Sequence, residues 1–143
     1  MNMNETYRVL GVMSGTSLDG IDFAICTFVR NTKWAFKIEK TKTIKYSEYW
    51  KKTLASLHKK TQSFILQIDI KYGKFLAKEI NHFLANEKVD FIASHGHTIF
   101  HQPEKNFTLQ IGSGETIANC TRIKTINNFR NLDVLLGGQG APL

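Results

Sequence analysis

Near its N-terminus the chain reads Gly11-Val12-Met13-Ser14-Gly15-Thr16-Ser17-Leu18-Asp19-Gly20-Ile21-Asp22. An apolar run over 7–12 leads into this stretch, and a second apolar run over 23–29 follows it. The pattern predicts a strand, a tight turn and a second strand. We expect Gly11, Gly15 and Gly20 to allow positive φ angles in this hairpin and close approach of its backbone to a ligand.

Hydroxyl and carboxylate side chains make this turn a candidate phosphate site. Ser14, Thr16 and Ser17 add hydroxyl donors, and consecutive N–H groups of a turn can bind an anion. Asp19 and Asp22 can hold a hydrated Mg²⁺ ion, which prefers oxygen ligands and keeps several waters. An ordinary hairpin with Asp and Gly at its turn is the alternative, but the density of such residues favours a functional loop.

The rest of the chain alternates between strand-like and helix-like patterns. The expected strands cover 6–13, 21–29, 33–45, 89–94, 107–111 and 122–127, and the expected helices cover 47–59, 62–86 and 112–120. In the third strand Trp34, Phe36 and Ile38 alternate with other residues, which predicts one wet face. The long helix has an apolar stripe, formed by Ile65, Ile68, Tyr72, Phe75 or Leu76, Ile80 and Phe83. Three antiparallel strands followed by helix-linked strands predict a ribonuclease H-like α/β fold with a mixed sheet.

Composition and charge narrow the class of protein. At 143 residues the chain has the length of one domain, and it has neither a run of 18 apolar residues nor a secretory signal pattern. We therefore expect a cytoplasmic protein without a membrane partner, in which Cys26 and Cys120 are buried free thiols. The net charge of +7 includes only four arginines, and the lysines have the spacing of solvated faces, so we expect no nucleic-acid function.

A histidine-rich stretch, Ser94-His95-Gly96-His97-Thr98, directly follows the expected strand 89–94. Ligand crevices of open α/β sheets lie at the ends of such strands, and imidazoles and a hydroxyl suit a sugar. Two alternatives remain open. One is a metal site of His95, His97 and His101, although this spacing fits no usual zinc pattern. The other is a turn with structural histidines.

A conspicuous carboxylate, Asp133, ends the stretch Asn128-Phe129-Arg130-Asn131-Leu132-Asp133, which follows the last expected strand. It lies between apolar residues and a glycine-rich segment over 137–140, and such a carboxylate is a candidate buried general base. An Asp at a turn or helix cap is the alternative. Arg130 can pair with a carboxylate or phosphate of a ligand through its planar fork, or with Asp133.

Three blocks of this sequence, in this order, resemble the anhydro-N-acetylmuramic acid kinase family. They are Gly11–Asp22; Ser94–Thr98 with His101, Pro103 and Thr108–Gly112; and Asn128–Asp133 followed by Gly137-Gly138-Gln139-Gly140-Ala141-Pro142-Leu143. The chain departs from the family pattern at His97, where Gln is more frequent, and at Asn128, where the family has Asp.

The resemblance implies an ATP- and Mg²⁺-dependent sugar kinase of the actin, hexokinase and Hsp70 ATPase superfamily. The implied substrate is 1,6-anhydro-N-acetylmuramic acid, and the implied product is N-acetylmuramic acid 6-phosphate, in peptidoglycan recycling. The resemblance assigns the ATP phosphates to Gly15, Thr16, Ser17, Leu18, Asp19, Gly20, Ile21 and Asp22, the metal to Asp19 and Asp22, the sugar to His95, Gly96, His97, Thr98 and Arg130, and the role of general base to Asp133.

The resemblance also implies that residues 1–143 are the N-terminal, ribonuclease H-like lobe of a longer protein. A second ATPase lobe with the adenosine pocket then lies outside this sequence, and the lobe alone is expected to be inactive. A homodimer is compatible with this interpretation. Two other functions compete with it: a kinase of the same superfamily with another acceptor, and a non-catalytic remnant that binds a nucleotide or sugar.

Overall fold

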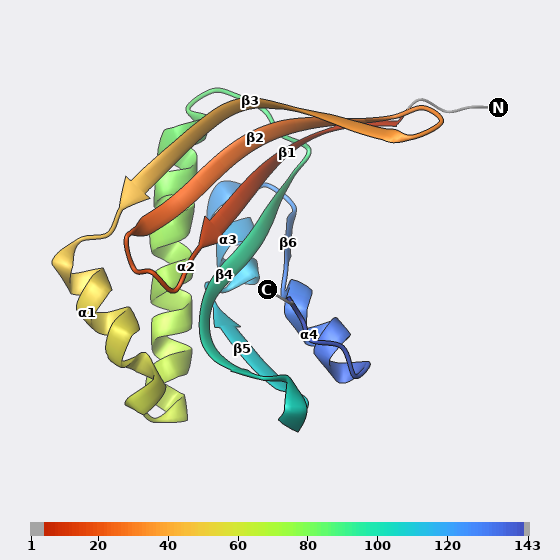
Figure 1. The fold of residues 1–143 in the computed structure, drawn as a ribbon. Helices are drawn as coiled ribbons and strands as arrows, with labels where there is room; N and C mark the ends of the chain where they lie inside the picture. The colour runs from red at the N-terminus through yellow and green to blue at the C-terminus, as the bar shows by residue number, and fades with distance from the viewer. Residues whose placement is uncertain (1–4, 142–143) are drawn as a thin grey trace.

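The fold is a mixed sheet with helices packed on one of its faces (Figure 1), seen in a computed structural model that describes residues 5–141. The strand order is β3-β2-β1-β4-β5, and β6 pairs with β4. The strands are β1 (Glu5–Ser14), β2 (Gly20–Arg30), β3 (Trp34–Lys45), β4 (Phe91–Gln102), β5 (Phe107–Ile111) and β6 (Thr125–Asn127). Because β1 to β3 are antiparallel while β4 runs parallel to β1 and β6, the predicted mixed α/β sheet is confirmed.

The helices lie close to their predicted positions. They are α1 (Glu48–Ser56), α2 (Gln62–Leu84), α3 (Gly114–Thr121) and α4 (Phe129–Leu135), with short 3₁₀ turns η1 (Leu57–Lys59) and η2 (Pro103–Lys105). The hydroxyls of Ser47, Thr61 and Ser113 cap the first three helices, as these residue types do at N-termini. The sequence did not predict α4, because a seven-residue helix with one buried residue, Val134, has no periodic apolar stripe.

The core lies between one face of the sheet and α2, which runs behind β1 to β3 in Figure 1. The predicted stripe of α2 is confirmed, with Leu76 buried and Phe75 half-buried. Facing it are the buried strand residues Leu10, Val12, Ile21, Phe23 and Ile25. These residues belong to one buried apolar cluster, and hydrophobic burial is the dominant force in folding.

The opposite face of the sheet is apolar but uncovered in residues 5–141. Trp34, Phe36 and Ile38 are all more than half exposed, so the expectation that only one face of β3 is wet is wrong. Alternation predicts that two faces differ, but it cannot predict whether a second layer covers either of them. Side chains of β1 to β4 and β6 instead line an outer apolar groove of about 760 Å³, among them Tyr7, Phe28, Trp34, Phe36, Phe91 and Ile126.

Both cysteines are free, but the expectation that they are buried is wrong. Cys26 lies on β2, two residues from Phe28 and thus on the uncovered side of the sheet, and it is half-buried. Cys120 is exposed in the last turn of α3. No helix within residues 5–141 is long and apolar enough to span a membrane.

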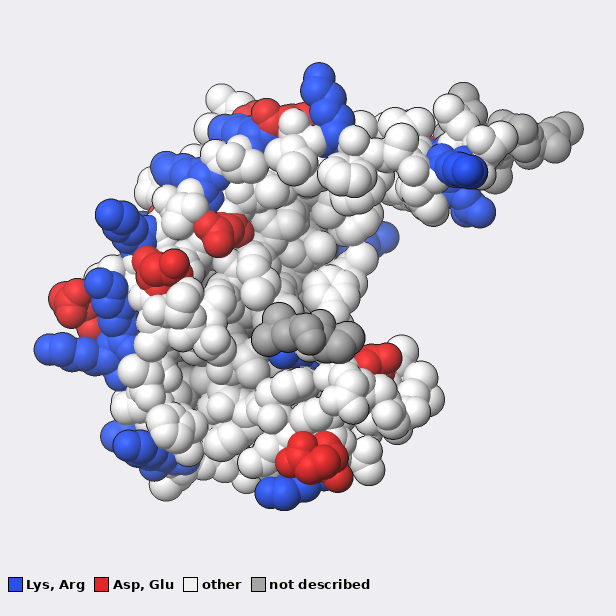
Figure 2. Space-filling view, in the orientation of Figure 1, with Lys and Arg blue, Asp and Glu red and all other residues white. Residues whose placement is uncertain are grey.

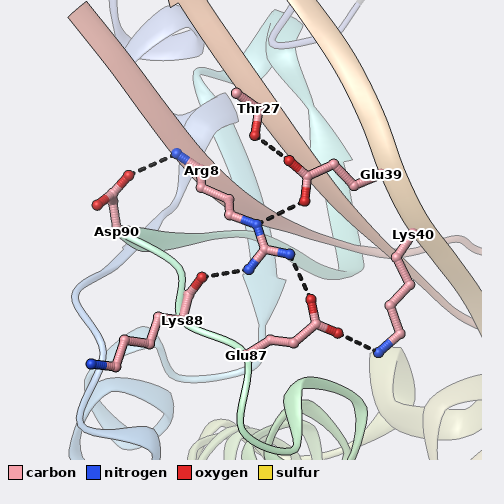
Figure 3. Close-up of polar contacts among 7 residues, drawn as sticks. All are labelled: Arg8, Thr27, Glu39, Lys40, Glu87, Lys88 and Asp90. Atoms are coloured by element: carbon pink, nitrogen blue, oxygen red, sulfur yellow. Dashed lines mark hydrogen bonds and ion pairs between the residues drawn. The ribbon is translucent and has the colours of Figure 1, made fainter.

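A network of charged side chains fastens the start of β1 to its neighbours (Figure 3). Arg8 donates to Glu39 on β3 at 2.7 Å, to Glu87 after α2 at 2.5 Å and to the carbonyl of Lys88 at 2.6 Å. Lys40 completes it with a bond of 2.7 Å to Glu87. Elsewhere on the face shown in Figure 2, Lys and Arg are scattered, and several of them stand beside acidic side chains.

Strand β4 contains a bulge and extends well beyond its predicted end at Ser94. Val12 pairs with Ser94, but Ser14 pairs with His97, so β4 has one more residue than β1 between these pairs. The bulge contains Gly96, whose φ angle is +73° and whose place a side chain cannot take, because a Cβ would clash with the carbonyl oxygen of Ile111. After the bulge, β4 pairs antiparallel with β5.

Gly20→Ala is expected to destabilise the fold, because a Cβ at this position clashes with the backbone carbonyl of Ile44. Overpacking of this kind typically costs about 1–3 kcal/mol. The matched control is Gly11→Ala on β1, where the nearest atom to the new Cβ lies at an ordinary 3.7 Å. Urea unfolding of both variants measures the difference, and equal stabilities would contradict the importance of this close approach.

Candidate functional site

The bulge in β4 separates two hollows. The first, which we call the polar cavity, has a volume of about 310 Å³ and lies beside the first half of β4. Side chains from α2, β4, β5, β6 and α4 line it, among them Asp69, Ser94, His95, Gln110, Asn127 and Asn131. Hydroxyl, amide, imidazole and carboxylate groups together match the hydrogen-bonding groups of a sugar.

His95 is held in one tautomer at the edge of the polar cavity. Its Nδ1 lies 2.8 Å from the carbonyl of Gly96, and its Nε2 accepts a hydrogen bond of 2.8 Å from Nε of Arg130. The proton is therefore assigned to Nδ1. Burial lowers the pKa of His95, and the charge of Arg130 lowers it further. Arg130 thus pairs with His95, so the alternative of an ion pair with Asp133 is wrong.

His97 lies on the other side of the bulge, in the buried cluster under the hairpin turn. Its Nδ1 is 3.4 Å from Oγ of Ser14, and that hydroxyl is also bonded to Tyr46 at 2.6 Å and to Tyr72 at 2.8 Å. Burial lowers the pKa of His97 to about 4, so its ring is neutral near pH 7. The cluster links the end of β1 to α2 and to the segment after β3.

The five predicted sugar ligands are therefore divided between two places. His95 and Gly96 line the polar cavity, with Arg130 bonded to His95. His97 and Thr98 instead line a hollow of about 250 Å³ that they share with Thr16 of the hairpin turn. The expectation of one continuous loop is wrong, because these residues lie within β4 and the bulge changes which way its side chains point. Their contact with a sugar stays a prediction.

The hairpin turn has the predicted position but a different backbone. Leu18, with a φ angle of +59°, has the left-handed conformation, whereas Gly11, Gly15 and Gly20 do not, so the expectation of positive φ angles at these glycines is wrong. Gly20 is needed for a close approach of backbone to backbone instead. Ile21 is fully buried in the core, so only its backbone is available to a ligand.

The carboxylates of the hairpin are exposed and oriented by hydroxyls. Ser17 donates to Asp19 at 2.6 Å, which lowers the pKa of this carboxyl, and Thr43 donates to Asp22 at 2.5 Å. Lys51 and Lys52 of α1 share a hollow of about 530 Å³ with Ser17 and Asp19. Their spacing in the sequence is that of a solvated helix face. Only the packing of α1 beside the turn makes them candidates for binding an anion there.

Metal binding by the histidines is not supported by the described part of the chain. Residues 5–141 contain no group of three or more His, Cys, Asp or Glu side chains placed to hold an ion. Each ring is instead within hydrogen-bond distance of a different side chain: His95 of Arg130, His97 of Ser14, and His101 of Thr108 at 3.1 Å. Two exposed carboxylates such as Asp19 and Asp22 do suit Mg²⁺, which binds through one or two carboxylates and keeps its other ligands as water.

Asp133 holds the glycine-rich segment in place. It lies on α4 and is exposed, so the expectation of a buried carboxylate is wrong. Its Oδ2 accepts a hydrogen bond of 2.7 Å from the N–H of Gly140, and its carbonyl accepts one of 2.8 Å from Gly138. Asp133 is not among the residues that line the polar cavity. Pro142 and Leu143, at the end of the third block, lie outside the described residues.

Most residues that line the polar cavity were not predicted from the sequence. Asp69 could have been recognised as a candidate site residue, since it is the only acidic residue in the first half of α2 and stands next to the buried Ile68. Gln110 belongs to the second block but received no role. Asn127 and Asn131 carry no pattern of their own, because only the packing of β6 and α4 brings them to the cavity.

The family model and the curated relatives that match this chain carry the same family name. The family model described as anhydro-N-acetylmuramic acid kinase matches residues 7–143. Curated relatives of that name include proteins of Xanthomonas oryzae pv. oryzae (strain MAFF 311018), 37% identical over 145 residues, and Mannheimia succiniciproducens, 38% identical over 144 residues. In both cases the alignment covers 94% of this chain and 38% of the relative. The chain thus spans well under half the length of these relatives.

Acid should destabilise the fold through His97. Its pKa falls from 6.5 to about 4 on folding, so the unfolded state binds the proton more readily and the free energy of unfolding decreases as the pH is lowered from 6.5 to 4. Such a shift corresponds to at most about 3 kcal/mol. In urea titrations, the stability of wild type relative to His97→Gln should fall across this range. Parallel curves for the two proteins would show that His97 is not a neutral, buried ring.

Proposed function

This chain belongs to the anhydro-N-acetylmuramic acid kinase family, and we propose that it supplies the sugar-binding wall and the phosphate-binding turn of an ATP-dependent kinase acting on 1,6-anhydro-N-acetylmuramic acid. The observation that carries the proposal is the arrangement of hollows on either side of Gly96. On one side, the polar cavity has the hydrogen-bonding groups of a sugar site. On the other side, the hollow that His97 and Thr98 share with Thr16 adjoins the hollow with carboxylate and lysine side chains at the hairpin turn, because Leu18 and Ala55 line both. The mixed sheet, with β1 to β3 antiparallel, supports a ribonuclease H-like lobe of the actin, hexokinase and Hsp70 superfamily.

The phosphate side of the proposed site is the turn Gly15–Asp22. Its backbone N–H groups and the hydroxyl of Thr16 bind phosphate oxygens, while the hydroxyl of Ser17 orients Asp19, and Lys51 and Lys52 add positive charge beside them. Asp19 and Asp22 hold Mg²⁺, partly through water. When bound, this ion neutralises the charge on the phosphoryl oxygens.

The sugar side is the polar cavity together with Arg130. The guanidinium has five N–H donors, of which the structure assigns one to His95, and the others are suited to the lactyl carboxylate of the sugar. The neutral His95 fixes the position of this guanidinium without a competing charge. A carboxylate so bound places the sugar rings over the polar cavity.

In the proposed reaction Asp133 acts as the general base. It takes a proton from water, the water oxygen bonds to C1, and the bond from C1 to O6 breaks. The released O6 attacks the γ-phosphorus of ATP, and ADP leaves with the electrons of the broken phosphate bond, which gives N-acetylmuramic acid 6-phosphate. The adenosine pocket, a cytoplasmic location and a homodimer stay predictions, since this chain spans 38% of its relatives.

Asp133→Asn in the full-length kinase tests this function. Asn keeps an oxygen for the N–H of Gly140 but cannot take a proton, so turnover should fall about 10²–10⁴-fold while the melting temperature stays unchanged. Conversion of the anhydro sugar to its 6-phosphate with Mg-ATP is the measurement, and Glu115→Gln on α3 is the matched exposed control.

Near-normal turnover of Asp133→Asn would remove Asp133 from the chemistry. A parallel loss of melting temperature and turnover would instead assign it to the glycine-rich segment alone. If the wild-type kinase does not phosphorylate the anhydro sugar, the proposed function itself is wrong.

A further inference from the structure

Ser94 has a polar atom that the fold does not use. Its side chain is fully buried on β4 and lines the polar cavity. Within residues 5–141 its Oγ has no hydrogen-bond partner. A buried hydroxyl without a partner is unfavourable, and such groups in native proteins call for an explanation. A ligand in the cavity provides one.

Gln110 offers a second unused atom in the same cavity. Its Nε2 donates to Oγ1 of Thr108 at 2.7 Å, and that hydroxyl in turn donates to the carbonyl of Phe100 at 3.3 Å. The same hydroxyl lies 3.1 Å from Nδ1 of His101. When its one proton goes to Phe100 or to His101, it accepts from Gln110, and the amide is assigned on that basis. The carbonyl oxygen Oε1 is then left buried without a partner within residues 5–141.

Asp69 adds a carboxylate to these two groups. Its Oδ1 accepts a hydrogen bond of 2.7 Å from the N–H of Gly112, and a carboxylate has room for several donors. Its side chain is only partly exposed, and burial raises the pKa of this carboxyl above its usual value. This burial is unfavourable for the folded state at neutral pH, so the carboxylate is costly to keep here for structure alone.

We propose that Asp69, Ser94 and Gln110 form an acceptor subsite, which binds the hydroxyl and amide N–H groups of the uncharged part of the sugar. The three residues come from α2, β4 and β5 and line one cavity. Two of them present acceptor oxygens, which complement donors of the ligand, and the third is a hydroxyl that can accept or donate. The lining residues include the carboxylate of Asp69 and no Lys or Arg, which disfavours a phosphate or carboxylate at this subsite.

The subsite gives the bound sugar a direction. This deduction rests on the proposed function, in which the substrate has both a carboxylate and neutral hydroxyl and acetamido groups. The neutral groups point to Asp69 and Gln110, and the carboxylate points to Arg130 at the His95 edge of the cavity. Repulsion between Asp69 and a reversed carboxylate disfavours the opposite orientation.

Sugar titrations of the 143-residue chain, followed by NMR at millimolar ligand, test the subsite. The ligands are 1,6-anhydro-N-acetylmuramic acid and 1,6-anhydro-N-acetylglucosamine, which lacks the lactyl carboxylate. Asp69→Asn and Ser94→Ala should each weaken binding of both sugars by about fivefold or more, the scale of a lost hydrogen bond. Arg130→Gln should weaken only the first sugar, and the matched control Glu115→Gln should change neither by more than about twofold.

Melting temperatures of the same variants separate this proposal from a structural role. Because burial disfavours the carboxylate, Asp69→Asn should melt at the same or a higher temperature than wild type at pH 7, and so should Ser94→Ala. Variants that bind within about twofold of wild type, or that lose binding only because they unfold, would overturn the subsite while the proposed function stands. A wild-type chain that binds neither sugar would overturn the subsite, whereas the proposed function is overturned only if the full-length kinase does not phosphorylate the anhydro sugar.

Discussion

The extra residue in β4 is the constraint on which the rest of the site depends. Gly96 adopts a φ angle of +73° against the carbonyl of Ile111, where a larger residue has no room. The bulge shifts the register of β4 relative to β1, so Ser94 and His97 both reach the helix side of the sheet while His95 turns to Arg130. Without it, strict alternation would place His95 and His97 on the same face. The bulge at Gly96 is therefore the reason that neighbouring residues of β4 line two separate hollows.

The two hollows differ in how their polar groups are satisfied. Under the hairpin turn, Ser14, Tyr46, Tyr72 and His97 bond to one another in a closed, buried cluster that supports the turn. In the polar cavity, by contrast, atoms of Ser94 and Gln110 have no partner within residues 5–141. A satisfied network adds rigidity, whereas unsatisfied groups reduce stability and are retained where a ligand uses them. The cluster under the hairpin turn is thus suited to holding the turn in place, and the polar cavity is suited to binding a ligand.

Local patterns predicted most of the fold, and long-range contacts decided what they missed. The hairpin, α2 and the positions of most strands along the chain follow from periodicity within short windows. The need for Gly96 arises from Ile111, the pairing of His95 depends on Arg130, and Asp69 reaches the cavity because α2 packs beside Gly112. None of these partners is near in sequence. For the same reason the exposure of Trp34 and of Asp133 was not predicted, because it depends on which elements cover them.

The most direct test is to map two ligands separately on the ¹⁵N-labelled chain. With 1,6-anhydro-N-acetylmuramic acid, the account predicts shifts of the amides of His95 and Gly112 around the polar cavity. With Mg-ATP, it predicts shifts at Thr16 and Lys52 around the hairpin turn. The account is contradicted if both ligands shift the same amides, or if the sugar shifts those of the outer apolar groove, such as Trp34, instead.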